Sequence, residues 1–132
     1  MIKYSLSIII LFTCAAAAQS MMLDSTTVLS GDSLSGVINL EGYALAGLRL
    51  PDTLAGGNIT LQDSWDGVNF KSVVAGDGTE LQFTITINGA VKLSPWETWN
   101  LAPFIKLKTG LTGSAAAQTS DRIIYIEKIR LN

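Results

Sequence analysis

The sequence predicts an all-β protein: an antiparallel β-sandwich, jelly-roll-like, preceded by a short apolar N-terminal segment. Two observations predict this fold class. Apolar and polar residues alternate along many short stretches from residue 23 onward, and turn signals such as Asp66-Gly67 and Asn88-Gly89 separate these stretches. The chain has 132 residues, 48% of them hydrophobic and 15% charged, which is enough for one domain with a buried core.

Residues 1–20 differ from the rest of the chain, and we assign residues 21–132 to the sandwich domain. One basic residue, an apolar run and a run of alanines ending before Gln19 resemble a secretory signal peptide. The apolar run is shorter than the about 20 residues that cross a bilayer, so we expect no membrane span. Two other interpretations stay open: translation starts at Met21 or Met22, or the segment is retained as an arm.

The first clear strands lie in the middle of the chain. Residues 46–50 alternate between apolar and other side chains, and Pro51 ends that strand. Residues 59–65 form the next strand, which ends at Asp66-Gly67. We therefore expect short strands joined by tight turns, as in a sandwich or barrel.

Residues 81–87 show the clearest period of two, because every second residue is apolar and the residues between them are polar. Asn88-Gly89 follows directly, and the extended pattern resumes at residues 91–93. An Asn-Gly pair between two such stretches predicts a β-hairpin.

The last two predicted strands cover residues 104–108 and 121–131. Between them, residues 109–120 are small and polar, which predicts a long surface loop. The final stretch carries apolar residues on both faces, so we expect it to be a central, well-paired strand.

Composition excludes several chemistries. The chain has no histidine and a single cysteine, Cys14, so it can form no Ser-His-Asp triad, no His-ligated zinc site and no internal disulfide. The net charge of −2 argues against nucleic acid as a partner. Asp63, Asp66, Asp77 and Glu80 lie close in sequence, but their spacing does not match a calcium loop and fits turns better. We expect a non-enzymatic protein without metal or cofactor.

Three tryptophans are the candidate contact residues. Trp65 precedes Asp66-Gly67, and Trp96 and Trp99 lie in a turn-like stretch after the predicted hairpin. Exposed aromatic rings can stack on sugar rings or on a protein partner. For Trp96 and Trp99 the competing interpretation, which we favour, places one or both rings in the end of the sandwich core.

The sequence resembles small virion-associated proteins of tailed phages and prophages over residues 24–132. The resemblance lies in strand and turn phrases, not in catalytic motifs: residues 25–36, 38–51, 59–62, 64–70, 78–80, 104–110 and 117–122. Family members begin close to the start of the domain and carry a smaller residue before Asp-Gly, so residues 1–20 and the Asp63-Ser64-Trp65 stretch depart from the pattern.

The resemblance implies a structural virion protein, either a capsid decoration protein or a head-fibre component. Its partners would be the major capsid protein or another virion protein together with sister copies, so we expect a homo-oligomer located in the virion. The alternative is a secreted or periplasmic carbohydrate-binding module, supported by the signal-like residues 1–20 and the tryptophans.

Overall fold

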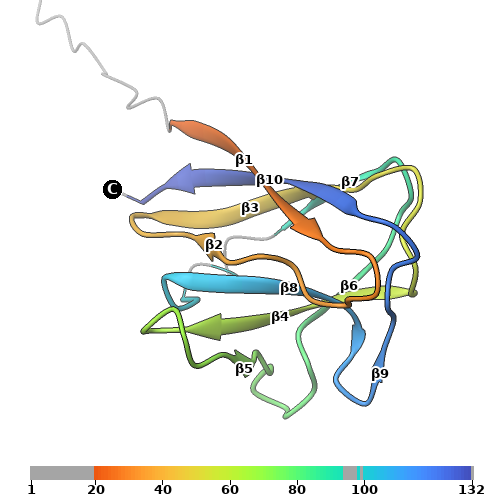
Figure 1. Cartoon of the computed structure of the whole chain (residues 1–132). Coiled ribbons are helices and arrows are strands. Elements are labelled where there is room, and N and C mark those ends of the chain that lie inside the picture. The colour runs from red at the N-terminus through yellow and green to blue at the C-terminus, as the bar shows by residue number, and fades with distance from the viewer. Residues whose placement is uncertain (1–19, 94–97, 99, 132) are drawn as a thin grey trace, which may run out of the picture.

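Two antiparallel sheets pack face to face in the computed structural model, which describes residues 20–93, 98 and 100–131. Figure 1 shows the two sheets as an upper and a lower layer. The predicted all-β fold class and the antiparallel β-sandwich are thereby confirmed. No helix in the described ranges is long and apolar enough to cross a membrane. The N-terminal segment, residues 1–19, lies outside the described residues.

One sheet has four strands in the order β1-β10-β3-β7. Their bounds are β1 Met21–Val28, β3 Tyr43–Arg49, β7 Ala90–Lys92 and β10 Arg122–Arg130. The final strand therefore lies between two neighbours, as its two apolar faces predicted. The register between β10 and β3 shifts between Glu127 and Lys128, which marks a β-bulge.

The other sheet has six strands, with β8 and β4 at its centre. The short strands β5 and β6 both pair with β4, while β2 and β9 pair with β8. The bounds are β2 Ile38–Asn39, β4 Asn58–Ser64, β5 Lys71–Ser72, β6 Gln82–Thr84, β8 Phe104–Leu111 and β9 Ser114–Ala115.

The core lies between the two sheets. Leu48 of β3 and Ile126 of β10 are register partners in one sheet and are fully buried. Leu61 of β4 and Leu107 of β8 are register partners in the other sheet and are also fully buried. Because side chains of a strand alternate between faces, each sheet presents every second residue to this core.

The predicted hairpin at Asn88-Gly89 is wrong in its connection. The turn itself forms, and Asn88 adopts a positive φ of 54°. However, β6 before the turn pairs with β4, while β7 after it pairs with β3 in the other sheet. The turn therefore passes the chain from one sheet to the other, because the two flanking strands find better partners elsewhere.

The predicted surface loop over residues 109–120 is correct for the exposed residues 111–115, 117, 119 and 120, but wrong for residues 109, 110 and 118, which are buried. Strand β8 continues to Leu111, and the fully buried Thr109 hydroxyl donates to the Ala116 carbonyl at 2.6 Å. Gln118 is 2% exposed, and its side chain accepts from the Ala55 N–H and donates to the Thr109 hydroxyl. Thr109 and Gln118 thus form hydrogen bonds with buried backbone groups at one end of the sandwich. In the sequence, small and polar residues with this role resemble those of a surface loop.

Candidate functional site

The solvent side of the four-stranded sheet carries apolar side chains. Leu23 of β1, and Ile123 and Tyr125 of β10, alternate with core positions, and they are 61%, 51% and 47% exposed. In the register, Tyr125 faces Ser25 on one side and Arg49 on the other. We call Leu23, Ile123 and Tyr125 the outer apolar face. The exposed face of an antiparallel sheet usually carries polar residues, so these three side chains depart from the usual alternation.

A buried carboxylate lies in the middle of the same surface. Glu127 is only 2% exposed although it points to the solvent side of β10. The Arg49 Nε donates to Glu127 Oε1 at 2.7 Å, and the Lys92 ammonium donates to Oε2. The hydrogen bonds from Lys92 and Arg49 hold the pKa of the Glu127 carboxyl below its usual range. The side chains of the two cations are themselves exposed, at 61% and 62%, while that of Glu127 is buried.

Gly47 makes room for this ion-pair cluster. It lies between Glu127 and Lys92 in the register. A Cβ at this position would lie 2.8 Å from Glu127 Oε2 and 2.9 Å from the Val91 carbonyl oxygen. The absence of a side chain therefore lets the carboxylate lie flat on the sheet, within reach of both cations.

A second ion pair joins Lys128 of β10 to Asp24 of the edge strand β1. The Lys128 ammonium donates to Asp24 Oδ2 at 2.9 Å and to the Asn39 carbonyl at 3.1 Å. The hydrogen bond from Lys128 is the main cause of a lowered pKa at Asp24. The buried Lys128 side chain therefore balances the negative charge of Asp24 on the edge strand.

Trp65 is displayed on a rigid turn at the end of β4. Trp65 is 80% exposed to solvent. The Asp66 carboxylate next to it accepts hydrogen bonds from Ser64, Val68 and Asn69, at 2.7 to 2.9 Å. Backbone and side-chain hydrogen bonds from Asn69 are the largest causes of the lowered Asp66 pKa. The turn orders the backbone on both sides of an exposed indole.

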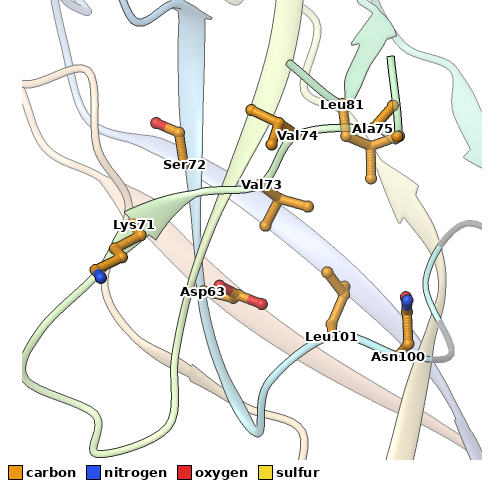
Figure 2. Close-up of a pocket in the computed structure, with 10 residues that line it drawn as sticks. Asp63, Lys71, Ser72, Val73, Val74, Ala75, Leu81, Asn100 and Leu101 are labelled. Carbon is orange, nitrogen blue, oxygen red and sulfur yellow. The ribbon is translucent and has the colours of Figure 1, made fainter. Parts of the chain in front are cut away.

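Two hollows share Asp63 and Lys71, and Trp65 lines one of them. One, of about 420 Å³, includes Trp65 itself and the side chain of Asn69. The other, of about 690 Å³, is shown in Figure 2, where Asp63 points between the β5 segment and Leu101. Asp63 Oδ2 accepts a hydrogen bond from the Ala102 N–H at 3.1 Å. Aromatic, acidic and basic groups therefore meet at this end of the molecule.

The structure places the predicted contact residues unequally. Trp65 lies on the surface. Trp96 and Trp99 lie outside the described residues, so the interpretation that places one or both of these rings in the core stays a prediction. Sequence reasoning missed the cluster of Arg49, Lys92 and Glu127. A single glutamate inside the apolar final stretch was the available signal.

The described part of the chain contains no group of three or more acidic or cysteine side chains placed to hold a metal ion. No protein-family model, curated protein or solved structure matches the chain. The fold and these surfaces therefore define its class, a small antiparallel β-sandwich with an apolar outer sheet face.

Proposed function

We propose that this protein is a structural, non-enzymatic virion protein that acts by assembly, as a capsid decoration protein or a head-fibre component. The outer apolar face carries this proposal, because Leu23, Ile123 and Tyr125 are apolar side chains exposed on the same side of one layer. Burying such a surface against a partner is the main source of association free energy. The Arg49, Lys92 and Glu127 cluster beside it adds an orienting polar contact.

The strand order supports a jelly-roll connection. Strands β1, β3, β7 and β10 form one sheet in the order β1-β10-β3-β7, and the other contains the order β2-β8-β4-β6, with β5 and β9 as additions. This alternation between layers is what a jelly roll would have, and jelly rolls are frequent in viral capsid proteins and in lectins. Capsid proteins and lectins share this kind of fold, so the strand order is compatible with either role.

In the proposed role the partners are the major capsid protein or another virion protein, together with sister copies of this chain. Many copies on one particle make individually weak contacts effective. Residues 1–20 then act as an arm, or are absent from the native protein when translation starts at Met21 or Met22. In the alternative they direct secretion.

Particles purified from the native culture provide the test. We expect mass spectrometry to recover the protein in a fixed ratio to the capsid protein. Binding of the purified full chain to particles that lack it should weaken at least tenfold on Tyr125→Lys, because this change puts a charge on the outer apolar face. Gln62→Lys, on the solvent side of the other sheet, is the matched control. Absence from particles and no binding by the wild-type chain would contradict the proposal.

A carbohydrate-binding role is the second candidate, and the exposure of Trp65 favours it. The indole offers a flat apolar surface for a sugar ring, while Asp63, Asn69 and Lys71 offer polar groups along the adjoining hollow. A neutral or acidic oligosaccharide fits this combination.

Titration of the full chain with a panel of oligosaccharides, followed by tryptophan fluorescence and calorimetry, tests this candidate. We expect Trp65→Ala to abolish binding and Trp65→Phe to retain part of it, since phenylalanine keeps an aromatic face. Lys106→Ala is a control at a charged residue that lines neither hollow. Equal affinity of wild type and Trp65→Ala would assign any sugar binding to another surface.

A further inference from the structure

The outer edge of β1 is open over residues 21–25 in the described part of the chain. Strand β1 ends the four-stranded sheet and pairs with β10 along its length, while on its outer side Ser35 bridges to Val28 at the C-terminal end of the strand. The Arg130 N–H donates to the Ser20 carbonyl, so even-numbered residues of β1 direct their backbone groups toward β10. The Gly36 N–H donates to the Thr27 carbonyl from the opposite side. Odd-numbered residues therefore direct their backbone groups outward.

The alternation between odd- and even-numbered residues identifies which backbone N–H and C=O groups of β1 point away from β10. The Ser25 N–H is taken by its neighbour, the Asp24 carboxylate, at 2.8 Å. The Met21 and Leu23 N–H and C=O groups, and the Ser25 carbonyl, point outward with no partner among the described residues. Met21, Met22 and Leu23 are also exposed side chains. The edge thus offers both a hydrogen-bond ladder and apolar area.

Over residues 21–25 the devices that usually protect a sheet edge are missing, whereas the segment of Ser35 and Gly36 covers the end of the strand at Thr27 and Val28. Natural edges carry prolines, lysines, bulges or unpaired charges that prevent pairing with another chain. Residues 21–28 contain no proline and no lysine, and the pairing with β10 is regular throughout. The single charge, Asp24, is balanced by Lys128.

We propose that a second copy of this chain pairs with β1, antiparallel, about a two-fold axis centred on Leu23. This inference rests on the proposed assembly function and names one of its partners. Leu23 of each copy both donates to and accepts from Leu23 of the other, and each Met21 N–H donates to the other Ser25 carbonyl. Met22 then lies opposite Asp24 of the other copy, so the carboxylates do not face each other. A two-fold axis relates only two copies, so this pairing gives a closed dimer.

The expected dimer is weak by itself. A stable interface buries about 1,200–2,000 Å² of accessible surface, and pairing along an edge this short buries less. It joins two four-stranded sheets into one continuous layer, with the outer apolar faces of both copies on the same side. Such a layer doubles the apolar area offered to a further partner and suits repeated packing on a particle.

Disulfide trapping in the full chain tests the register. In a Cys14→Ser background, Leu23→Cys places two thiols opposite each other, with Cα atoms about 5.5 Å apart in a hydrogen-bonded pair. That separation lies inside the disulfide range. We expect a covalent dimer under mild oxidation. Ile123→Cys, on the same face but on β10, is the matched control and should stay monomeric.

Proline substitution tests the ladder. Leu23→Pro removes an outward N–H without removing a bond to β10, so sedimentation velocity should show at least tenfold weaker dimerisation than for Leu23→Ala. Loss of association in Leu23→Pro without cross-linking of Leu23→Cys would assign the edge to another segment and overturn the inference. No cross-link and no effect of proline would also overturn it. Particle binding by such chains would leave the proposed function standing.

Discussion

The two sheets share one core but differ on their solvent sides. On the six-stranded sheet, Gln62 of β4 faces Lys106 of β8, and the Lys106 ammonium lies 4.6 Å from the centre of the Phe70 ring. On the four-stranded sheet, Leu23, Ile123 and Tyr125 are exposed instead. The first surface presents polar groups to water, whereas a partner on the second surface would remove apolar area from water.

The edge strands of the two sheets differ as well, in how far their backbone groups are paired. Each central strand of the six-stranded sheet has a further strand on both sides, and β5 and β6 divide the outer edge of β4 between them. Strand β1 has one neighbour and continues directly from the N-terminal residues. Exposed apolar area and an open ladder therefore occur together on one layer, which is the combination expected of an assembly surface.

The same substitution on the two faces of one sheet should give the largest contrast. Leu48→Ala empties a fully buried position, and we expect the free energy of unfolding to fall by about 2–5 kcal/mol. Leu23→Ala removes an exposed side chain and should change it by less than about 0.5 kcal/mol. Urea unfolding measures both. A large loss of stability for Leu23→Ala would show that this face is covered within the monomer.

Substitution at Gly47 tests whether the ion-pair cluster depends on close approach. Gly47→Ala forces its Cβ against Glu127 and the Val91 carbonyl, so we expect a loss of about 1–3 kcal/mol. Gly57→Ala is the matched control, because nothing lies within 4 Å of a Cβ there. Equal stability of the two variants would mean that β7 shifts freely, and that the cluster is not held by packing.

Acid should weaken the same cluster. The folded-state pKa of Glu127 lies below the ordinary value of 4.5, so its contribution to stability is complete above that pH. The contribution is lost as the pH falls through the lower, folded-state pKa. We expect unfolding at pH 7 to distinguish wild type from Glu127→Gln, and the difference to shrink below pH 4.5. A difference that is independent of pH would contradict the ion-pair assignment.

The smallest effect is expected on the solvated face. Lys106→Ala removes the cation above Phe70 and should cost about 0.5–1 kcal/mol, without any change in self-association or particle binding. Thermal unfolding and sedimentation velocity measure the two quantities. Weaker association of this variant would move the contact surface to the six-stranded sheet and invert the comparison.

Local pattern predicted the fold class because it reports burial one strand at a time. The alternation around Leu48 and around Leu61 identified core positions correctly. It could not identify partners, and for this reason the strands flanking Asn88-Gly89 were assigned to one hairpin. Strand β1 escaped notice because its exposed methionines do not alternate with polar residues.

The candidate site was predictable only in part. Exposed aromatics were considered from sequence, and Trp65 is one of them. The cluster around Glu127 was not considered, since Arg49, Lys92 and Glu127 come from three strands far apart in the chain. Gln118 was assigned to a surface loop for the same reason, because its partner Ala55 lies in another part of the sequence.

The sequence by itself determined that this chain forms short antiparallel strands with one buried side, because the period of apolar residues follows directly from the geometry of a strand. Only the tertiary structure decided which strands pair, which solvent face stays apolar and which edge stays open. Those properties depend on contacts between residues distant in sequence, such as Glu127 with Lys92 and Asp24 with Lys128. No local pattern records such contacts, since each partner is an ordinary surface residue until the sheets form.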